Sequence, residues 1–269
     1  MYIIKIFTYN IYEYERGVII KKIIKSLIIT IIMFTMFFTS TYIVANASGW
    51  GFRKNNNHLV PEIGKYKEII DDTDSFYVGK NEKTVYLTFD AGYDNGVLPL
   101  ILDVLSSKDV KASFFVTGDF VKRFPELTLR MVYDGHIVCN HSYTHKSITK
   151  HDLNSLKLDL EKLEEEFYKL TNTKMVKYFR PPAGEFDRDS LMNLKSLGYK
   201  TVFWSIAYVD WKTNDQSGAD YCVKTVMDNL HNGAIILMHS VSSSNQEALS
   251  TVIDNITKEG YTFKTVLDL

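Results

Sequence analysis

The sequence predicts an α/β protein in which helices cover a parallel sheet, and three observations support this fold class. From residue 84 onward, short apolar runs rich in β-forming side chains alternate with amphipathic stretches of helical period. No repeat, low-complexity block or Pro/Gly/Ser-rich linker interrupts that region, so we expect one domain over residues 84–269. Polar clusters follow several of the apolar runs, as expected at the carboxyl ends of parallel strands.

The expected strands are short apolar runs bounded by turn residues. The first, residues 84–89 (TVYLTF), ends at the turn Asp90-Ala91-Gly92. The remaining expected strands are residues 112–116, 136–139, 176–179, 201–206 and 234–238, and a short last strand near Phe263.

The expected helices carry apolar residues on one face. In the clearest one, residues 151–170, that face consists of Leu153, Leu156, Leu160, Leu163, Phe167 and Leu170. The others are residues 98–105, 119–133 with Asp119 as the N-cap, 187–197 closed by Gly198, 219–230 and 246–258.

Residues 1–47 are predicted to be a signal peptide or a membrane anchor. Lys21, Lys22 and Lys25 precede an uncharged apolar run over residues 27–44, and the small-x-small pattern Ala45-Asn46-Ala47 follows it. We favour cleavage after Ala47; an uncleaved anchor is the alternative, because the run is about long enough to span a bilayer. With either outcome we expect the part of the chain after residue 47 to be extracytoplasmic, secreted or membrane-anchored, with membrane contact only through this segment. Residues 48–83 follow as a polar, loop-rich N-terminal segment.

The overall composition excludes several classes of protein. The formal net charge is -1, with 31 basic and 32 acidic residues, so no basic footprint for nucleic acid exists. Two cysteines, Cys139 and Cys222, are too few for a disulfide scaffold. We expect two buried free thiols, with a single long-range disulfide as the alternative. We also expect a monomer.

The polar clusters contain the groups needed for metal-assisted hydrolysis. Asp90 at a strand end is a candidate general base, the alternative being an Asp that only caps the next turn. His141 and His145 are spaced so that both imidazoles can face one ion, although two surface histidines would show the same spacing. Arg180, after the strand at 176–179, can hold a carboxylate in a fixed geometry or form a simple rim salt bridge.

A second acid–base pair is predicted further along the chain. Asp210 would orient and charge His239, whose imidazolium would then protonate a leaving amine. Tyr208 and Trp211 would form an apolar wall for a sugar or an acyl methyl group, with ordinary core packing as the alternative for each.

Taken together, five blocks resemble the motifs of the polysaccharide deacetylase family: Thr88-Phe89-Asp90-Ala91-Gly92, His141-Ser142-Tyr143-Thr144-His145, Arg180-Pro181-Pro182-Ala183-Gly184, Asp210-Trp211 and Leu237-Met238-His239. The resemblance covers roughly residues 84–269. It implies a distorted, incomplete (β/α) barrel and a divalent metal ion, with zinc expected.

The resemblance also implies a role for each matching residue. Asp90 would be the base, His141 and His145 the metal ligands, Arg180 the residue that steadies the base, Asp210 the residue that tunes the acid and His239 the acid. The expected substrate contacts are Pro182, Tyr208, Trp211 and Leu237, and the last two would line the acetyl pocket.

One position departs from the family pattern. The usual first motif has two consecutive aspartates, of which the second is a metal ligand, and this chain has Ala91 there. We therefore expect the ion to be held weakly. The same replacement resembles the subgroup that acts on N-acetylmuramic acid in peptidoglycan, as do Gly49-Trp50-Gly51-Phe52 and residues 201–205 and 207–212.

Three functions remain open at this point. The first is an exported deacetylase of N-acetylmuramic acid in peptidoglycan glycan strands. The resemblance to that subgroup implies that the deacetylated muramic acid is the precursor of muramic δ-lactam in spore cortex. The second is a deacetylase of N-acetylglucosamine in peptidoglycan or chitin-like oligosaccharides. The third is a catalytically weak glycan-binding protein, because of Ala91.

Overall fold

The structure is a computed structural model, and it describes residues 48–54 and 57–269. The predicted signal peptide or anchor at residues 1–47 lies outside them. None of the described helices is long and apolar enough to cross a membrane.

The main sheet of the described chain has eight strands in the order β10-β3-β4-β5-β6-β8-β2, and β9 also pairs with β3. Every pairing between these strands is parallel. The sheet curls into a half-barrel, as the family resemblance predicts. The strands are β2 (Ser75–Phe76), β3 (Thr84–Ala91), β4 (Ser113–Val116), β5 (Ile137–Asn140), β6 (Tyr178–Phe179), β8 (Lys200–Val202), β9 (Ala234–His239) and β10 (Thr262–Lys264).

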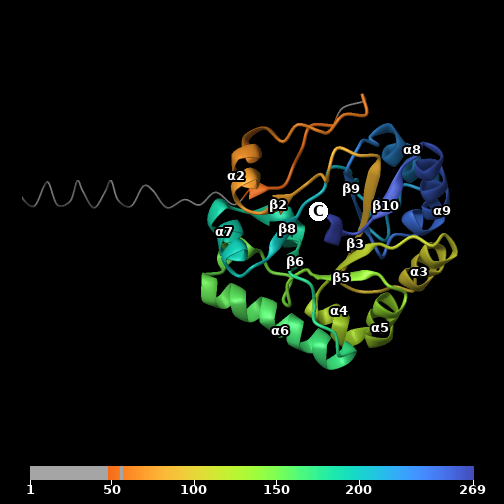
Figure 1. The fold of residues 1–269 in the computed structure, drawn as a ribbon. Coiled ribbons are helices and arrows are strands. Elements are labelled where there is room, and N and C mark those ends of the chain that lie inside the picture. Colours follow the sequence, from red (N-terminus) through yellow and green to blue (C-terminus); the bar gives the residue numbers. More distant parts are fainter. Residues whose placement is uncertain (1–47, 55–56) are drawn as a thin grey trace, which may run out of the picture. The chain divides into compact units, whose positions relative to one another are not determined.

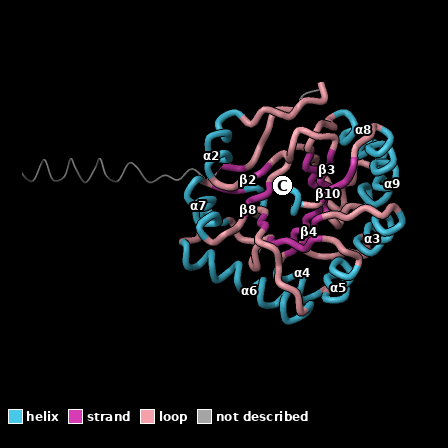
Figure 2. Tube along the Cα trace, in the orientation of Figure 1, coloured by secondary structure: helices cyan, strands magenta, loops and turns pink. Residues whose placement is uncertain are grey.

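Helices surround the strands on the outside, and the C-terminus lies near the centre of the view (Figures 1 and 2). This arrangement confirms the predicted strand–helix alternation, because parallel strands need a crossover between them. The helices are α2 (Lys67–Asp72), α3 (Leu98–Ser107), α4 (Gly118–Arg123), α5 (Pro125–Tyr133), α6 (Leu153–Thr171), α7 (Arg188–Ser196), α8 (Ala219–Asp228) and α9 (Ser243–Lys258).

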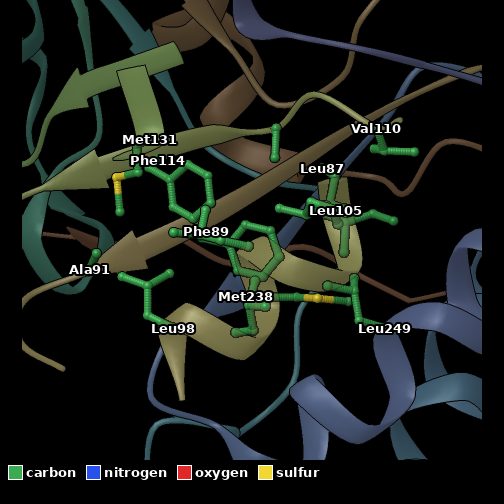
Figure 3. Close-up of a cluster of buried hydrophobic side chains, with 14 of the residues drawn as sticks. Leu87, Phe89, Ala91, Leu98, Leu105, Val110, Phe114, Met131, Met238 and Leu249 are labelled. Atoms are coloured by element: carbon green, nitrogen blue, oxygen red, sulfur yellow. The ribbon is translucent and has the colours of Figure 1, made fainter. Parts of the chain in front are cut away.

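Side-chain alternation along β3 divides the apolar interior into two layers. Leu87, Phe89 and Ala91 point outward into the cluster between the sheet and the helices (Figure 3). Tyr86 points inward, to a smaller cluster inside the half-barrel. Asp90 is four positions after Tyr86 on the same strand, so its side chain points to the same inner face. Strand β3 therefore separates the predicted base from the outer apolar cluster.

Both cysteines are free and buried, as expected. Cys139 lies in the inner cluster, and Cys222 lies in the outer one. The alternative of a disulfide between them is wrong.

The helix predicted over residues 119–133 is two helices, α4 and α5. Phe124 between them has non-helical backbone angles (φ -128°, ψ 54°), and Pro125 begins α5. A residue before proline avoids the helical region, so the break follows from Pro125. The N-cap of α4 is Thr117, whose side chain accepts a hydrogen bond from Phe120 N, rather than Asp119.

The segment over residues 48–83 is more ordered than its composition suggested. It contains α2 and also β2, which pairs with β8 inside the main sheet. Ahead of these, β1 (Ser48–Gly49) pairs antiparallel with β7 (Glu185–Phe186). Trp50 stacks on Phe203 with ring centroids 4.4 Å apart. Strands of two residues carry no detectable period, and for that reason the sequence pattern missed them.

Candidate active site

The register between β3 and β9 places the predicted base beside the predicted acid. Asp90 is the Cα partner of His239, and Thr88 is the partner of Leu237. Paired residues on neighbouring strands point to the same face and lie about 5 Å apart. The two strands therefore bring Asp90 and His239 together at their carboxyl ends, with Leu237 one layer below His239.

Arg180 follows β6 and is completely buried under the base. Its Nη1 donates to Asp90 Oδ1 at 2.8 Å, its Nη2 to Thr88 Oγ1 at 2.9 Å and its Nε to Val202 O at 3.1 Å. The guanidinium also lies 4.1 Å from the ring centroid of Phe115. Three directed donors fix the plane of the cation, so Arg180 fixes the orientation of the Asp90 carboxylate.

The charge of Arg180 keeps Asp90 ionised. Burial of the carboxyl group opposes ionisation, but neighbouring positive groups, Arg180 foremost, outweigh it and lower the pKa of Asp90 from its ordinary value of 3.8. The carboxylate is thus held in the form that accepts a proton.

His141 and His145 lie on a curved loop after β5, with ring centroids 4.9 Å apart. The Nδ1 atom of His141 faces Arg180 O at 2.8 Å, so it carries the hydrogen and leaves the Nε2 lone pair free. That Nε2 lies 3.5 Å from Asp90 Oδ2. Burial lowers the pKa of His141 to about 4 and also lowers the pKa of His145, so both rings are neutral at neutral pH, as metal ligands must be.

The histidine loop depends on a carboxylate that sequence patterns missed. Asp159, on the buried side of α6, accepts hydrogen bonds from Tyr143 N at 2.9 Å, from Thr144 N at 3.1 Å and from Thr144 Oγ1 at 2.7 Å. The backbone turns through positive φ at Ser142 (68°) and at His145 (55°). A loop in that conformation needs such fixed partners. The sequence does contain one signal for this role, because Asp159 is an acidic residue next to Leu156 and Leu160 of the apolar helix face.

His239 and Asp210 form the second pair, as predicted. His239 Nδ1 lies 2.6 Å from Asp210 Oδ1, and the backbone N–H of His239 donates to Asp210 Oδ2 at 2.8 Å. Burial lowers the pKa of His239, but the hydrogen bond and the charge of Asp210 outweigh it, and the pKa rises above 6.5. Because Nδ1 is bonded to the carboxylate, Nε2 is the nitrogen available to give a proton to substrate.

The four predicted substrate contacts differ in their accessibility. Trp211 is 50% exposed, and its ring centroid lies 5.4 Å from that of His239. Leu237 is buried below His239, and Pro182 is buried in the turn after Arg180. Tyr208 is buried, and its hydroxyl donates to Asn245 Oδ1 at 2.8 Å, which commits its polar end to the protein. The four contacts remain predictions.

The site has two protein ligands suited to a divalent ion. Among the described residues, no group of three or more His, Cys, Asp or Glu side chains could hold a metal. Ala91 is fully buried in the outer apolar cluster, so its side chain contributes no ligand. The two neutral rings of His141 and His145 fit two positions around an ion, and water or substrate oxygens would have to complete its coordination.

Comparison with known proteins identifies the family. Residues 77–202 match the polysaccharide deacetylase family. The chain is also 46% identical over 222 residues to peptidoglycan-N-acetylmuramic acid deacetylase PdaA of Bacillus subtilis, a match that covers 82% of this chain and 84% of that protein. The chain belongs to the polysaccharide deacetylase family. It is therefore a hydrolase that acts on amide bonds.

Solved structures agree with this family and with its fold. The structure of Bacillus subtilis PdaA, a family 4 carbohydrate esterase, matches with a TM-score of 0.81 at 45% identity and covers 84% of this chain and 98% of that one. A peptidoglycan-N-acetylglucosamine deacetylase of Bacillus cereus is 33% identical over 190 residues, or 69% of this chain and 68% of that protein. Enzymes of this family depend on a metal, and its identity here is not fixed by these matches.

The family also contains a relative without activity. A structure described as a pseudoenzyme of the same esterase family, from Bacillus anthracis, matches with a TM-score of 0.67 at 33% identity, covering 72% of this chain and 68% of that one. In this chain the two ion pairs of the site, Asp90–Arg180 and Asp210–His239, are both present.

Proposed function

We propose that this protein removes the N-acetyl group of N-acetylmuramic acid in peptidoglycan and yields a free amine and acetate. The observation that carries the proposal is the pairing of Asp90 with His239 across β3 and β9, each next to a partner of opposite charge. The choice of muramic acid is supported by the 46% identity to a deacetylase named for that sugar. The free amine would serve as the precursor of muramic δ-lactam in spore cortex.

In the proposed mechanism, Asp90 accepts a proton from the attacking water, and Arg180 keeps the carboxylate ionised and oriented. The water oxygen bonds to the acetyl carbon. His239 donates the proton on Nε2 to the leaving nitrogen as the carbon–nitrogen bond breaks, while Asp210 holds the opposite side of the ring. A divalent ion held by His141 and His145 would supply a Lewis acid for the acetyl carbonyl oxygen.

The glycan substrate and the acetyl group would meet different surfaces of the site. Trp211, half-exposed beside His239, offers a ring face to a sugar, and Leu237 offers an apolar floor to the acetyl methyl group. We also propose export of the catalytic part, on the basis of the basic, apolar and Ala45-Asn46-Ala47 sequence of the leader. N-terminal sequencing of the protein recovered from the cell exterior would test cleavage before Ser48.

The decisive experiment is mass spectrometry of peptidoglycan glycan strands, with and without stem peptides, after incubation with the protein and zinc. We expect loss of one acetyl group from muramic acid, and no loss with the variant Asp90→Asn. The surface variant Asp103→Asn should match the wild type.

Other outcomes would change the assignment. The 33% identity to a glucosamine deacetylase supports the second candidate, and acetyl loss from glucosamine would favour it. Binding of strands without release of acetate would instead support the glycan-binding alternative.

A further inference from the structure

A buried polar group behind the acid holds the second oxygen of Asp210. Asn245 Nδ2 donates to Asp210 Oδ2 at 2.6 Å, and the same amide also reaches His239 O at 3.3 Å. Asn245 is fully buried in the first turn of α9, where its backbone N–H donates to Ser242 Oγ. This amide therefore joins the Asp210 carboxylate to the first turn of the helix that follows His239.

The neighbours of Asn245 fix which way its amide points. Asp210 Oδ2 and His239 O accept hydrogen bonds only, so the nitrogen must face them. The oxygen then faces Tyr208, whose hydroxyl donates to it at 2.8 Å. Burial raises the pKa of Tyr208, so this hydroxyl remains a donor. Both polar atoms of the Asn245 side chain are thus used, and a reversed amide would lose the bonds to Asp210 Oδ2 and to His239 O.

Asp210 depends on this amide for its orientation. Its Oδ2 has a second donor in the backbone N–H of His239, and its Oδ1 faces the ring of His239. Without Asn245, the carboxylate would keep only contacts to His239 itself. Nothing outside the pair would then set the carboxylate against the imidazole.

We propose that Asn245 is a positioning residue for the general acid, and that Tyr208 holds the Asn245 amide in the orientation this requires. The inference rests on the proposed function for its kinetic consequence, but its structural consequence is independent of any substrate. It assigns Tyr208 to support of the acid rather than to contact with the sugar.

The charges around His239 decide the expected direction of its titration. Asp210 and Asp90 raise its pKa, Arg180 lowers it, and His145 lies near enough to interact. If Asp210 turns away from the ring, the imidazolium of His239 loses the partner that raises its pKa most, so the pKa of His239 falls.

The test is a titration of His239 by ¹⁵N NMR in the full-length protein, with the resonance identified by its loss in His239→Gln. Asn245→Ala should lower the pKa of His239 by about one unit, the size expected when one hydrogen bond to a charged group is lost. Tyr208→Phe should shift it in the same direction by less, and it keeps the test available if Asn245→Ala does not fold. A pKa that is unchanged or raised in the folded variants would overturn the proposal.

The matched control is Asn229→Ala at the end of α8. Asn229 also makes a side-chain hydrogen bond, to Thr225 O at 2.8 Å, and it takes part in none of the hydrogen bonds described above for the site. It should leave the titration of His239 unchanged. In the deacetylation assay, Asn245→Ala should lower kcat about 10-fold and change KM by less than about twofold.

The two proposals can fail separately. If Asn245→Ala lowers the pKa of His239 as expected but the wild-type protein releases no acetate, the proposed function is overturned and the role of Asn245 stays intact. If the wild-type protein releases acetate but the pKa of His239 is unchanged in Asn245→Ala, the role of Asn245 is overturned and the proposed function stays intact.

Discussion

The active site has two halves, which differ in the charge of the buried partner and in the elements that carry them. The base half, which comprises Asp90, Arg180, His141 and His145, lies at the carboxyl ends of β3, β5 and β6, with a buried cation beneath the carboxylate. The acid half, which comprises His239, Asp210 and Asn245, joins one strand end to a loop and to the first turn of a helix. In the base half the Arg180 cation lowers the pKa of Asp90, and in the acid half the Asp210 carboxylate raises the pKa of His239.

This difference shows how one small site keeps two neighbouring groups in opposite protonation states. Asp90 and His239 are paired across two strands, so each contributes to the field at the other. Giving each group a fixed partner of opposite charge separates their pKa values. Asp90 is held by one buried cation, Arg180, at a strand end. His239 is held by a hydrogen-bond network through Asp210 and Asn245, whose bonds can be removed singly by mutation.

The largest effect is expected from breaking the base half with Asp90→Asn. Loss of the general base should lower kcat about 10³-fold. The buried charge of Arg180 would also lose its counterion, so the free energy of unfolding should fall by about 1.5–3 kcal/mol. Acetate release and chemical denaturation measure the two effects.

Asp103→Asn is the matched control, because Asp103 pairs with Arg130 on the surface at 2.6 Å. It should change stability by less than about 1 kcal/mol and leave kcat unaltered. Substantial activity in Asp90→Asn would remove Asp90 from the role of base.

Breaking the acid half with Asp210→Asn should have the next largest effect, a fall in kcat of about 10²-fold. His239 must be protonated to act as an acid, so activity is lost as pH rises through its pKa, which lies above 6.5 in the wild type. Removing the negative charge lowers that pKa, and the alkaline limb of the pH–rate profile should move to lower pH. An unmoved limb would show that His239 is not the group that titrates there.

A smaller effect is expected from Asp159→Ala, which loosens the histidine loop without touching either acid–base pair. The variant removes three hydrogen bonds to that loop, and zinc affinity should fall about 10-fold, measured by competition with a chromophoric chelator. Glu165→Ala, an exposed position on the same helix, is the control and should bind zinc normally. Equal affinities in both variants would mean that the loop holds its shape alone.

The smallest effect on turnover is expected from Trp211→Ala, which removes an apolar wall beside the acid. We expect KM to rise about fivefold with kcat little changed, because the ring offers contact area to a sugar rather than a proton path. Tyr168→Ala, an exposed aromatic on α6, should leave KM unchanged. A fall in kcat without a change in KM would indicate that Trp211 acts through His239 instead.

The strand–helix order and the main site residues could be predicted from the sequence. Asp90, His141, Arg180 and His239 each follow or end an apolar run, and the structure places each of them at a strand end. The prediction failed where elements are very short or broken, as at Pro125 and at β2. Asp159 and Asn245 were missed because the partners that matter, Tyr143 and Thr144 for Asp159 and Asp210 for Asn245, are 15 to 35 positions away along the chain, where no local period reveals them.

The sequence by itself determined which groups the site contains, since residue type and strand-end position depend on local pattern. The tertiary structure alone decided how those groups act on one another. The register of β3 against β9, the burial of Arg180 under Asp90 and the contact of Asn245 with Asp210 set the protonation states, because electrostatic effects depend on distance and burial rather than on order along the chain.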